Sequence, residues 1–345
     1  MRCAYCFEQS STLLRCSGCK TRIYCSQECQ TIDWNNGQIH KKWCKTTCGE
    51  ENIDWEINYI NAERGMGLVT KRPFQENERV LVERVYTLKE IQSFTKPSML
   101  KAFLKLAPVI SEETLQTDIK SAIESKFYLN CIRIRDTNEV DDNNEKAAIG
   151  IRLSRANHSC HPNCDWWDTG KEIILITRSA VCAQEELTFA YTNALDPIEK
   201  SLSVEEARNL LLKKWHITCS PSCDCFNMKK CKEIDHIRTL TSSITDLIQL
   251  NKLQEAFEVS NTVLCLHISL KTSKLQQLSI MWNSFCIGIS VNQSTESQAL
   301  KILDDLHSIA IQIFGPKNDI TLQYEKLLKN PTSHPNHFTN RNHSY

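Results

Sequence analysis

The first 44 residues contain eight cysteine and histidine side chains at metal-ligand spacing: Cys3-x2-Cys6-x9-Cys16-x2-Cys19-x5-Cys25-x3-Cys29-x10-His40-x3-Cys44. They form four close pairs, and a tight turn lets both members of such a pair bind one metal ion. Eight nitrogen and sulfur ligands therefore predict two tetrahedral Zn²⁺ sites. So short a segment cannot bury a sufficient apolar core, so we expect metal binding to supply its folding energy. Free structural cysteines, the alternative, do not explain the register of all eight ligands.

The composition of the chain excludes several classes of protein. The 345 residues carry 41 Lys and Arg against 41 Asp and Glu, so a protein that mainly neutralises nucleic-acid phosphates is not expected. Residues 1–48 are mildly basic, with seven Lys and Arg against three acids. No apolar run approaches the roughly 18 residues of a membrane span. We see no export signal before Cys3, so the 18 cysteines are expected to be reduced, in a protein of the nucleus and cytoplasm.

The rest of the chain predicts a mixed region followed by helices, which gives an α+β fold class. Residues 49–213 contain β-favouring runs at Val80, Val82 and 173–176, and a helical insert at about 86–126. A cysteine cluster spans 214–231. Residues 232–330 predict an array of helices with apolar stripes, the clearest being Ile302, Leu306, Ile309 and Ile313; Leu278, Trp282, Phe285 and Ile289; and Ile237, Leu240, Ile244 and Leu247. Gly315-Pro316 should end one helix, and we expect 331–345 to be a disordered tail with solvated His334, His337 and His343.

Three separated motifs in the middle region carry the candidate chemistry. They are RGMGL at 64–68, RANHSCHPNC at 155–164 and EELTFAY at 185–191. The glycines of the first motif could serve only a turn, so it is weak evidence by itself. Only the combination of all three motifs in this order is specific.

These features resemble known families. The zinc pattern, with Tyr24-Cys25-Ser26 and the HKKWC ending at 40–44, resembles a MYND finger. The three motifs resemble a SET-domain protein-lysine methyltransferase, and the whole order resembles the SET and MYND domain (SMYD) family, in the arthropod-like arrangement with the finger first. The resemblance implies a knot-like threading of the segment that ends at Tyr191. It also implies interleaved finger ligands: Cys3, Cys6, Cys25 and Cys29 for one ion, and Cys16, Cys19, His40 and Cys44 for the other.

The resemblance also implies an S-adenosylmethionine site and a catalytic residue. The residues matching cofactor contacts are Arg64, Gly65, Met66, Gly67, Asn130, Ser154, Asn157, His158, Trp215 and Ile217. Tyr191 matches the tyrosine at the methyl-transfer site, where it would orient the substrate amine; the alternative is a core tyrosine. Two positions depart from the family: Met66 replaces a polar residue, and Ile217 replaces an aromatic one, so it cannot stack on adenine.

The resemblance implies a third zinc site, formed with cysteines that follow the SET region in the sequence. In SET proteins, three cysteines of the segment after the domain join the cysteine of the NHSC string, here Cys160. Four candidates compete for three places: Cys219, Cys223, Cys225 and Cys231. Two sets of three ligands remain open, because neither reproduces the family spacing. One set is Cys223, Cys225 and Cys231, and the other is Cys219, Cys223 and Cys225.

The leading hypothesis is therefore a protein-lysine N-methyltransferase that acts on a histone or non-histone lysine, as a monomer that does not contact membranes. The alternative is a weak or inactive SET-fold scaffold, whose finger binds peptide partners and whose helices recruit proteins in transcriptional regulation. A zinc hydrolase is disfavoured, because four protein ligands close each finger site and leave no position for water.

Overall fold

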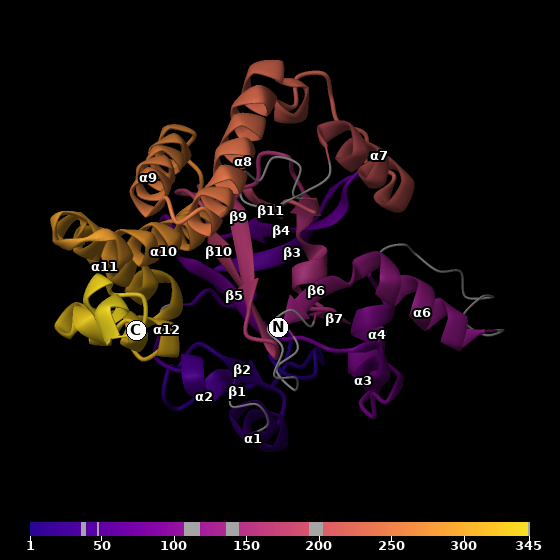
Figure 1. Ribbon diagram of the computed structural model, residues 1–345. Helices are drawn as coiled ribbons and strands as arrows, with labels where there is room; N and C mark the ends of the chain where they lie inside the picture. The colour runs from indigo at the N-terminus through magenta and orange to yellow at the C-terminus, as the bar shows by residue number, and fades with distance from the viewer. Residues whose placement is uncertain (36–38, 47, 107–117, 136–144, 193–202, 344–345) are drawn as a thin grey trace. The chain divides into compact units, whose positions relative to one another are not determined.

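The computed structural model describes residues 1–35, 39–46, 48–106, 118–135, 145–192 and 203–343 (Figure 1). The chain divides into two compact units, Met1–Ala190 and Tyr191–Tyr345. The first unit contains the finger and the β-rich region, and the second contains helices. Together they confirm the predicted α+β class. Among the helices of the described ranges, none combines the length and apolar character that a bilayer crossing requires.

The finger is small, and cysteines make up half of its buried hydrophobic residues. It comprises β1 (Leu14–Arg15), β2 (Ile23–Tyr24), α1 (Gln27–Asn35) and α2 (Ile39–Trp43). Its buried side chains include Cys3, Cys6, Cys16, Cys29 and Tyr24. This composition agrees with the expectation that the segment lacks an apolar core of its own.

The β-rich region contains one four-stranded and one three-stranded sheet. The first has the order β3 (Trp55–Asn61), β4 (Gly65–Thr70), β11 (Glu186–Phe189) and β8 (Asn157–His158). The second has the order β5 (Arg79–Arg84), β10 (Glu172–Thr177) and β9 (Cys164–Asp168), and a separate pair joins β6 (Ile132–Arg135) to β7 (Glu145–Ala148). The predicted strands at Val80, Val82 and 173–176 are thus confirmed in β5 and β10, where all these residues are buried.

The strand β11 positions the three sequence motifs relative to one another. It pairs antiparallel with β4, which begins at Gly65, and parallel with β8, through Thr188↔Asn157 and Phe189↔His158. Parallel strands need a crossover connection, so β8 and β11 become neighbours only through the tertiary fold. The knot-like threading would require this neighbourhood; the threading itself stays a prediction.

The region of the predicted helical insert contains three described helices and packs on the finger. It contains α3 (Leu88–Gln92), α4 (Pro97–Leu104) and α6 (Ile119–Asn130), while the part of the predicted insert at 107–117 lies outside the described residues. One apolar cluster joins insert and finger side chains, including Met99, Phe103 and Phe127 with Cys3 and Tyr24. The finger therefore buries its cysteine core against the insert.

The second unit is the predicted helical array. It contains α7 (Val204–Trp215), the 3₁₀ turn η2 (Asp224–Phe226), α8 (Met228–Gln249), α9 (Leu253–Ser269), α10 (Lys274–Val291), α11 (Gln293–Phe314) and α12 (Asp319–Lys329) (Figure 1). The α11 stripe is buried throughout, whereas Trp282, Leu240 and Leu247 of the other stripes are only half-buried. Gly315 ends α11 with a φ of 88°, as its sequence predicts. The predicted boundary at 231/232 falls inside α8.

The prediction of a disordered tail is wrong for residues 331–340. The short turns η3 (Pro331–Ser333) and η4 (Phe338–His343) follow α12, and both His334 and His337 are buried rather than solvated. The His334 ring lies 5.4 Å from the Phe285 ring, and His337 Nε2 lies 3.2 Å from Glu296 Oε1. Their partners are about 40 or more positions earlier, where a polar tail composition gives no sign of them.

Candidate functional site

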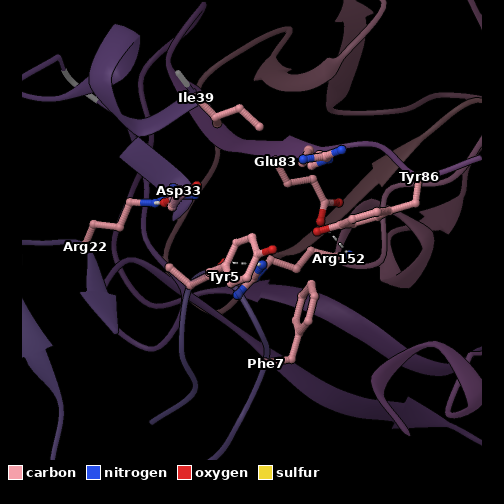
Figure 2. Close-up of a pocket in the computed structure, with 10 residues that line it drawn as sticks. Tyr5, Phe7, Arg22, Asp33, Ile39, Glu83, Tyr86 and Arg152 are labelled. Atoms are coloured by element: carbon pink, nitrogen blue, oxygen red, sulfur yellow. Dashed lines mark hydrogen bonds and ion pairs between the residues drawn. The ribbon is translucent and has the colours of Figure 1, made fainter. Parts of the chain in front are cut away.

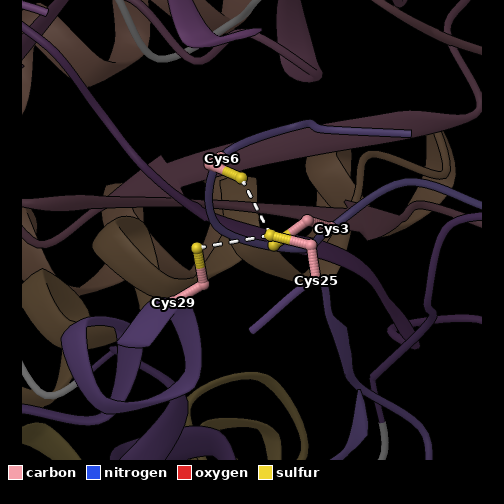
Figure 3. Close-up of side chains that lie close together, drawn as sticks. All are labelled: Cys3, Cys6, Cys25 and Cys29. Atoms are coloured by element: carbon pink, nitrogen blue, oxygen red, sulfur yellow. Dashed lines mark hydrogen bonds between the residues drawn. The ribbon is translucent and has the colours of Figure 1, made fainter. Parts of the chain in front are cut away.

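The first finger zinc group brings together Cys3, Cys6, Cys25 and Cys29, as the resemblance implied (Figure 3). All four sulfurs lie within 4.8 Å of one another, with Cys6 and Cys25 3.5 Å apart and Cys25 and Cys29 3.6 Å apart. Tetrahedral thiolates about 2.3 Å from zinc are separated by about 3.8 Å. The donor set and its dimensions therefore fit one Zn²⁺ ion.

The second finger group contains Cys16, Cys19, His40 and Cys44. Cys16 and Cys44 sulfurs lie 3.8 Å apart, and Cys19 Sγ lies 3.6 Å from His40 Nε2. Burial, together with the nearby Arg22 charge, lowers the pKa of His40 to about 4. The imidazole is therefore neutral at physiological pH, which is the form that binds Zn²⁺.

A buried ion pair connects the elements of the finger. Arg22 Nε donates to Asp33 Oδ2 at 2.7 Å, and the Tyr24 hydroxyl donates to the same oxygen at 2.8 Å. Burial raises the pKa of Asp33, but the adjacent Arg22 charge outweighs this and leaves the pKa below its usual value. The ionised carboxylate thus holds α1 against β2.

The finger meets the SET region along a polar seam centred on Arg152. Its guanidinium pairs with Glu51 at 2.8 Å and donates to the carbonyls of Cys3 and Ala4 at 3.3 and 3.2 Å. Figure 2 shows Arg152 with Glu83, Tyr86 and Phe7 around a cavity of about 10 Å³. Because Cys3 is a zinc ligand, this seam ties the first zinc group to the turn that precedes the NHSC string.

That turn is fixed by a buried carboxylate. Glu83 of β5 accepts the backbone N–H groups of Arg152 and Leu153 at 3.0 and 2.6 Å. Burial raises the pKa of Glu83, although Arg152 opposes this. A Cβ atom on Gly150 would lie 2.6 Å from the same carboxylate, so the glycine permits this close approach.

Residues of all three motifs meet at the neighbouring strands β4, β11 and β8 of the four-stranded sheet, a place that we call the sheet edge. Asn157 Nδ2 donates to Met66 O at 3.2 Å and to Glu186 Oε1 at 2.7 Å. Arg64 pairs with Glu186 at 3.0 Å and donates to His158 O at 3.4 Å. The structure therefore brings together six of the predicted cofactor residues: Arg64, Gly65, Met66, Gly67, Asn157 and His158.

The two glycines of the first motif have different roles. Gly65 has a φ of +66°, which a side chain would strain, and open space beyond it. A Cβ on Gly67 would lie 2.6 Å from Glu186 Oε1 and 2.7 Å from Ile60 Cγ1. Gly67 thus makes room for the side chains of Glu186 and Ile60.

Two residues that position this edge were not predicted. Glu186 joins Arg64 to Asn157, and Asn163 accepts the Thr188 N–H at 2.9 Å while donating to Glu186 O at 2.8 Å. Both residues lie inside the motifs quoted above, and this membership is the sequence feature that could have identified them as site residues. Their polar character alone did not show which partner each would find.

Two other predicted cofactor residues belong to the first unit. Ser154 precedes Asn157 by three positions, and Asn130 lies at the end of the insert. Ser154 donates to Gly150 O at 2.8 Å, and Asn130, the last residue of α6, donates to Lys126 O at 2.8 Å. His158 Nε2 lies 3.2 Å from Cys160 Sγ. Burial lowers the pKa of His158 to about 4, with a contribution from Arg64, so its imidazole is neutral.

In the second unit, the structure brings Tyr191 beside Trp215. Their ring centroids are 5.2 Å apart at an interplanar angle of 56°. Ile217 is half-buried after α7, where His216 takes a left-handed conformation with a φ of 57°. Two of the three predicted catalytic and cofactor residues of this unit therefore form one aromatic pair.

The cysteine cluster of the second unit distinguishes between the two sets left open by the sequence. Cys219, Cys223 and Cys225 have sulfurs within 4.8 Å of one another, with Cys223 and Cys225 3.3 Å apart. Cys231 lies in the first turn of α8, and its thiol faces the carbonyl of Cys225 at 3.9 Å. Three thiols, without Cys231, thus form a partial metal site.

Comparison with known proteins identifies both domains. Residues 3–44 match the MYND finger family, and residues 65–192 match the SET domain family. A SET and MYND domain-containing protein of Dictyostelium discoideum is 26% identical, over 54% of this chain and 37% of that protein. The SET domain and MYND-type zinc finger protein 6 of Schizosaccharomyces pombe is 25% identical, over 68% and 45% of the two chains.

A third relative carries an enzyme name. The histone-lysine N-methyltransferase SMYD3 of Homo sapiens is 24% identical, over 65% of this chain and 50% of that protein. The chain thus spans half or less of the length of these relatives. Since a MYND finger precedes a SET domain in the same chain, the protein belongs to the SET and MYND domain (SMYD-like) family.

Proposed function

We propose that this chain is a protein-lysine N-methyltransferase, which transfers a methyl group from S-adenosylmethionine to a lysine of a histone or non-histone protein. The observation that carries the proposal is the meeting of Arg64, Met66 and Asn157 around Glu186 at one sheet edge. Tyr191 follows β11, the central strand of that edge, by two residues.

The edge has the chemistry that an amino-acid-like cofactor needs. The Arg64 side chain is 37% exposed although it pairs with Glu186, so it keeps donors for a carboxylate. The backbone at Gly65 is open, because nothing lies within 4 Å of its missing Cβ. When bound there, S-adenosylmethionine would supply a methyl group activated by its sulfonium. Arg64, Asn157 and the strand backbone would hold it.

The protein's remaining task is to deliver a neutral, oriented amine. A free lysine has a pKa of about 10.4, so most of it is protonated at neutral pH. The Tyr191 hydroxyl would orient the amine, and water would carry the proton away, because a phenol of pKa near 10 is a poor base at neutral pH. Contact with the Trp215 ring limits the directions that the Tyr191 side chain can take. Positioning is therefore the main contribution expected of these residues.

Tyr191→Phe is expected to lower methyl transfer by about 100-fold or more, since it removes one positioned hydroxyl at the reacting centre. Binding of S-adenosylmethionine should change little. Transfer of labelled methyl to a peptide array measures the first quantity, and calorimetry measures the second. Tyr324→Phe, in the buried part of α12, is the matched control and should retain activity. A Tyr191→Phe protein with full activity would show that the tyrosine only packs.

We also propose that Cys160 completes a third zinc site with Cys219, Cys223 and Cys225. The support is the three-thiol group of the second unit and the position of Cys160 in the NHSC string. Cys225→Ser is expected to reduce zinc content from three ions to two per chain, whereas Cys231→Ser should retain three. Elemental analysis of the purified variants measures this. Loss of zinc in Cys231→Ser alone would refute the ligand set.

The same calorimetry tests the scaffold alternative, which Ile217 favours because it cannot stack on adenine as an aromatic residue would. No binding at millimolar S-adenosylmethionine would leave a protein that acts through its finger and helices alone. Protein substrates, peptide partners of the finger, and a location in the nucleus and cytoplasm form part of the proposal.

A further inference from the structure

A second cavity in the first unit is lined mainly by basic side chains. It has a volume of about 130 Å³ and lies between the start of the finger, helix α4 and the turn before the NHSC string. Five cationic side chains line it against two carboxylates, Glu8 and Glu51; the cations are Arg2, Lys101, Lys105, Arg152 and Arg155. Phe7, Ile57 and Ile151 add apolar surface to its wall.

The buried carboxylate of this cavity is already committed to other cations. Glu51 pairs with Arg152 at 2.8 Å and with Arg2 at 3.2 Å. Arg152 is additionally held by two finger carbonyls, so its charge is satisfied by protein atoms. The excess positive charge of the cavity therefore belongs to the other cations.

Arg155 is the cation with the least compensation. It is partly buried, and within the described ranges its guanidinium has no hydrogen bond or ion pair. Arg2 and Lys126 are cationic neighbours, and only Glu51 attracts it from a distance. Burial, and then Arg2, lower the pKa of Arg155 to about 10, and the more distant Glu51 only partly opposes this. A charge removed from water without a partner is costly, and a bound anion would remove that cost.

Helix α4 and the residue that follows it add two further cations at the rim. Lys101 and Lys105 are exposed and four residues apart, so they share one side of the chain and repel each other. In the part of the chain that the structure covers, neither forms an ion pair or a side-chain hydrogen bond. Among the described residues, Arg155 and these two lysines thus line one cavity without an ion pair of their own.

We propose that this cavity binds the phosphoryl group of a phosphoserine or phosphothreonine on a protein. A guanidinium holds a phosphate through two parallel N–H donors, and lysines add charge from the rim. The apolar wall of Phe7 and Ile57 suits the carbon atoms that link such a phosphate to its backbone. A nucleic acid would need basic surface along several phosphates, whereas here Glu8 lies in the lining and the chain has no net charge.

The cavity is separate from the proposed cofactor edge. None of Arg64, Met66, Gly67, Asn157 or His158 lines it. Arg155 nevertheless lies directly between Ser154 and Ala156, two residues before Asn157. Phosphate binding can therefore be measured without methyl transfer, and its outcome is independent of the proposed function.

The test uses the full zinc-loaded chain and a fluorescent peptide with one phosphoserine and no other charged side chain. Fluorescence anisotropy compares it with the unphosphorylated peptide. Arg155→Met should weaken binding about 10-fold or more, and Lys101→Met about threefold, because each removes one charge-assisted contact. Lys89→Met, an exposed lysine of α3 outside the cavity, is the matched control and should stay within about twofold. Inorganic phosphate should compete.

Three results would overturn the proposal. One is equal binding of the phosphorylated and unphosphorylated peptides, and another is unchanged affinity in both Arg155→Met and Lys101→Met. The third is a cavity that takes inorganic phosphate or a short single-stranded oligonucleotide but not the phosphopeptide. Thermal melting of each variant shows that it is folded. Lys101→Met keeps the test decisive if Arg155→Met does not fold, since Lys101 is exposed.

Discussion

Removal of zinc with a strong chelator will unfold residues 1–44. Structural zinc contributes about 10–16 kcal/mol to the folding of small zinc domains. The finger has few apolar side chains to replace that energy, since cysteines make up half of its buried hydrophobic residues. Its contact with the insert should be lost as well, because Cys3 and Cys6 belong to the cluster that joins them. Hydrogen exchange read by mass spectrometry should show loss of protection throughout the finger.

Two cysteine variants distinguish the effect of losing zinc from the effect of replacing a cysteine that binds no metal. Cys16→Ser should lose the second finger ion, whereas Cys265→Ser, an exposed cysteine of α9 outside the metal groups, should retain every ion. Restoring Zn²⁺ should restore the protection. If the chelated finger kept its protected amides, its stability would have to come from packing, and the metal sites would be dispensable to the fold.

Arg152→Met is expected to destabilise the first unit by about 3–5 kcal/mol, the usual loss when one partner of a buried ion pair is removed. Arg152 is 6% exposed, and its loss would leave Glu51 and the carbonyls of Cys3 and Ala4 without their main donor. For a unit of this size, the melting temperature should fall by about 10 °C. Calorimetric or circular dichroism melting of the zinc-loaded protein measures the change.

Two further variants test whether loss of the buried ion pair causes this destabilisation. Arg84→Met removes a pair with Glu90 in which both side chains are over a third exposed, and it should cost about 1 kcal/mol or less. Adding Glu51→Gln to Arg152→Met should recover part of the loss, because it removes the carboxylate left behind. Equal destabilisation by Arg152→Met and Arg84→Met would contradict a buried electrostatic seam.

The metal ligands illustrate how far the sequence could predict a site. All eight finger ligands were identified from spacing, because chelation by a pair of residues is a local property of the chain. Their division into two sets of four rested on family resemblance, and the structure groups the same side chains in the same two sets. For the later cysteines spacing was insufficient: Cys231 departs from the group because α8 has already begun there and carries its thiol away.

The helical array and the tail show the same contrast. Periodic apolar stripes on α8, α10 and α11 predicted helices, since periodicity is written along the chain. Nothing local indicated that His334 and His337 are buried, because their partners Phe285 and Glu296 lie on α10 and α11. Composition therefore predicted disorder where long-range contacts produce order.

By itself, the sequence determined the order of the domains, the finger's zinc ligands and the motifs from which an enzyme could be built. It could do so because ligand spacing, helical period and motif order are properties of neighbouring residues. Only the tertiary structure decided that Glu186 joins Arg64 to Asn157, that Arg152 fastens the finger to the SET region, and that Arg155 lines a cavity with four other cationic side chains. These contacts pair residues from 29 to 149 positions apart, and the energy of a buried charge depends on which groups the fold brings around it.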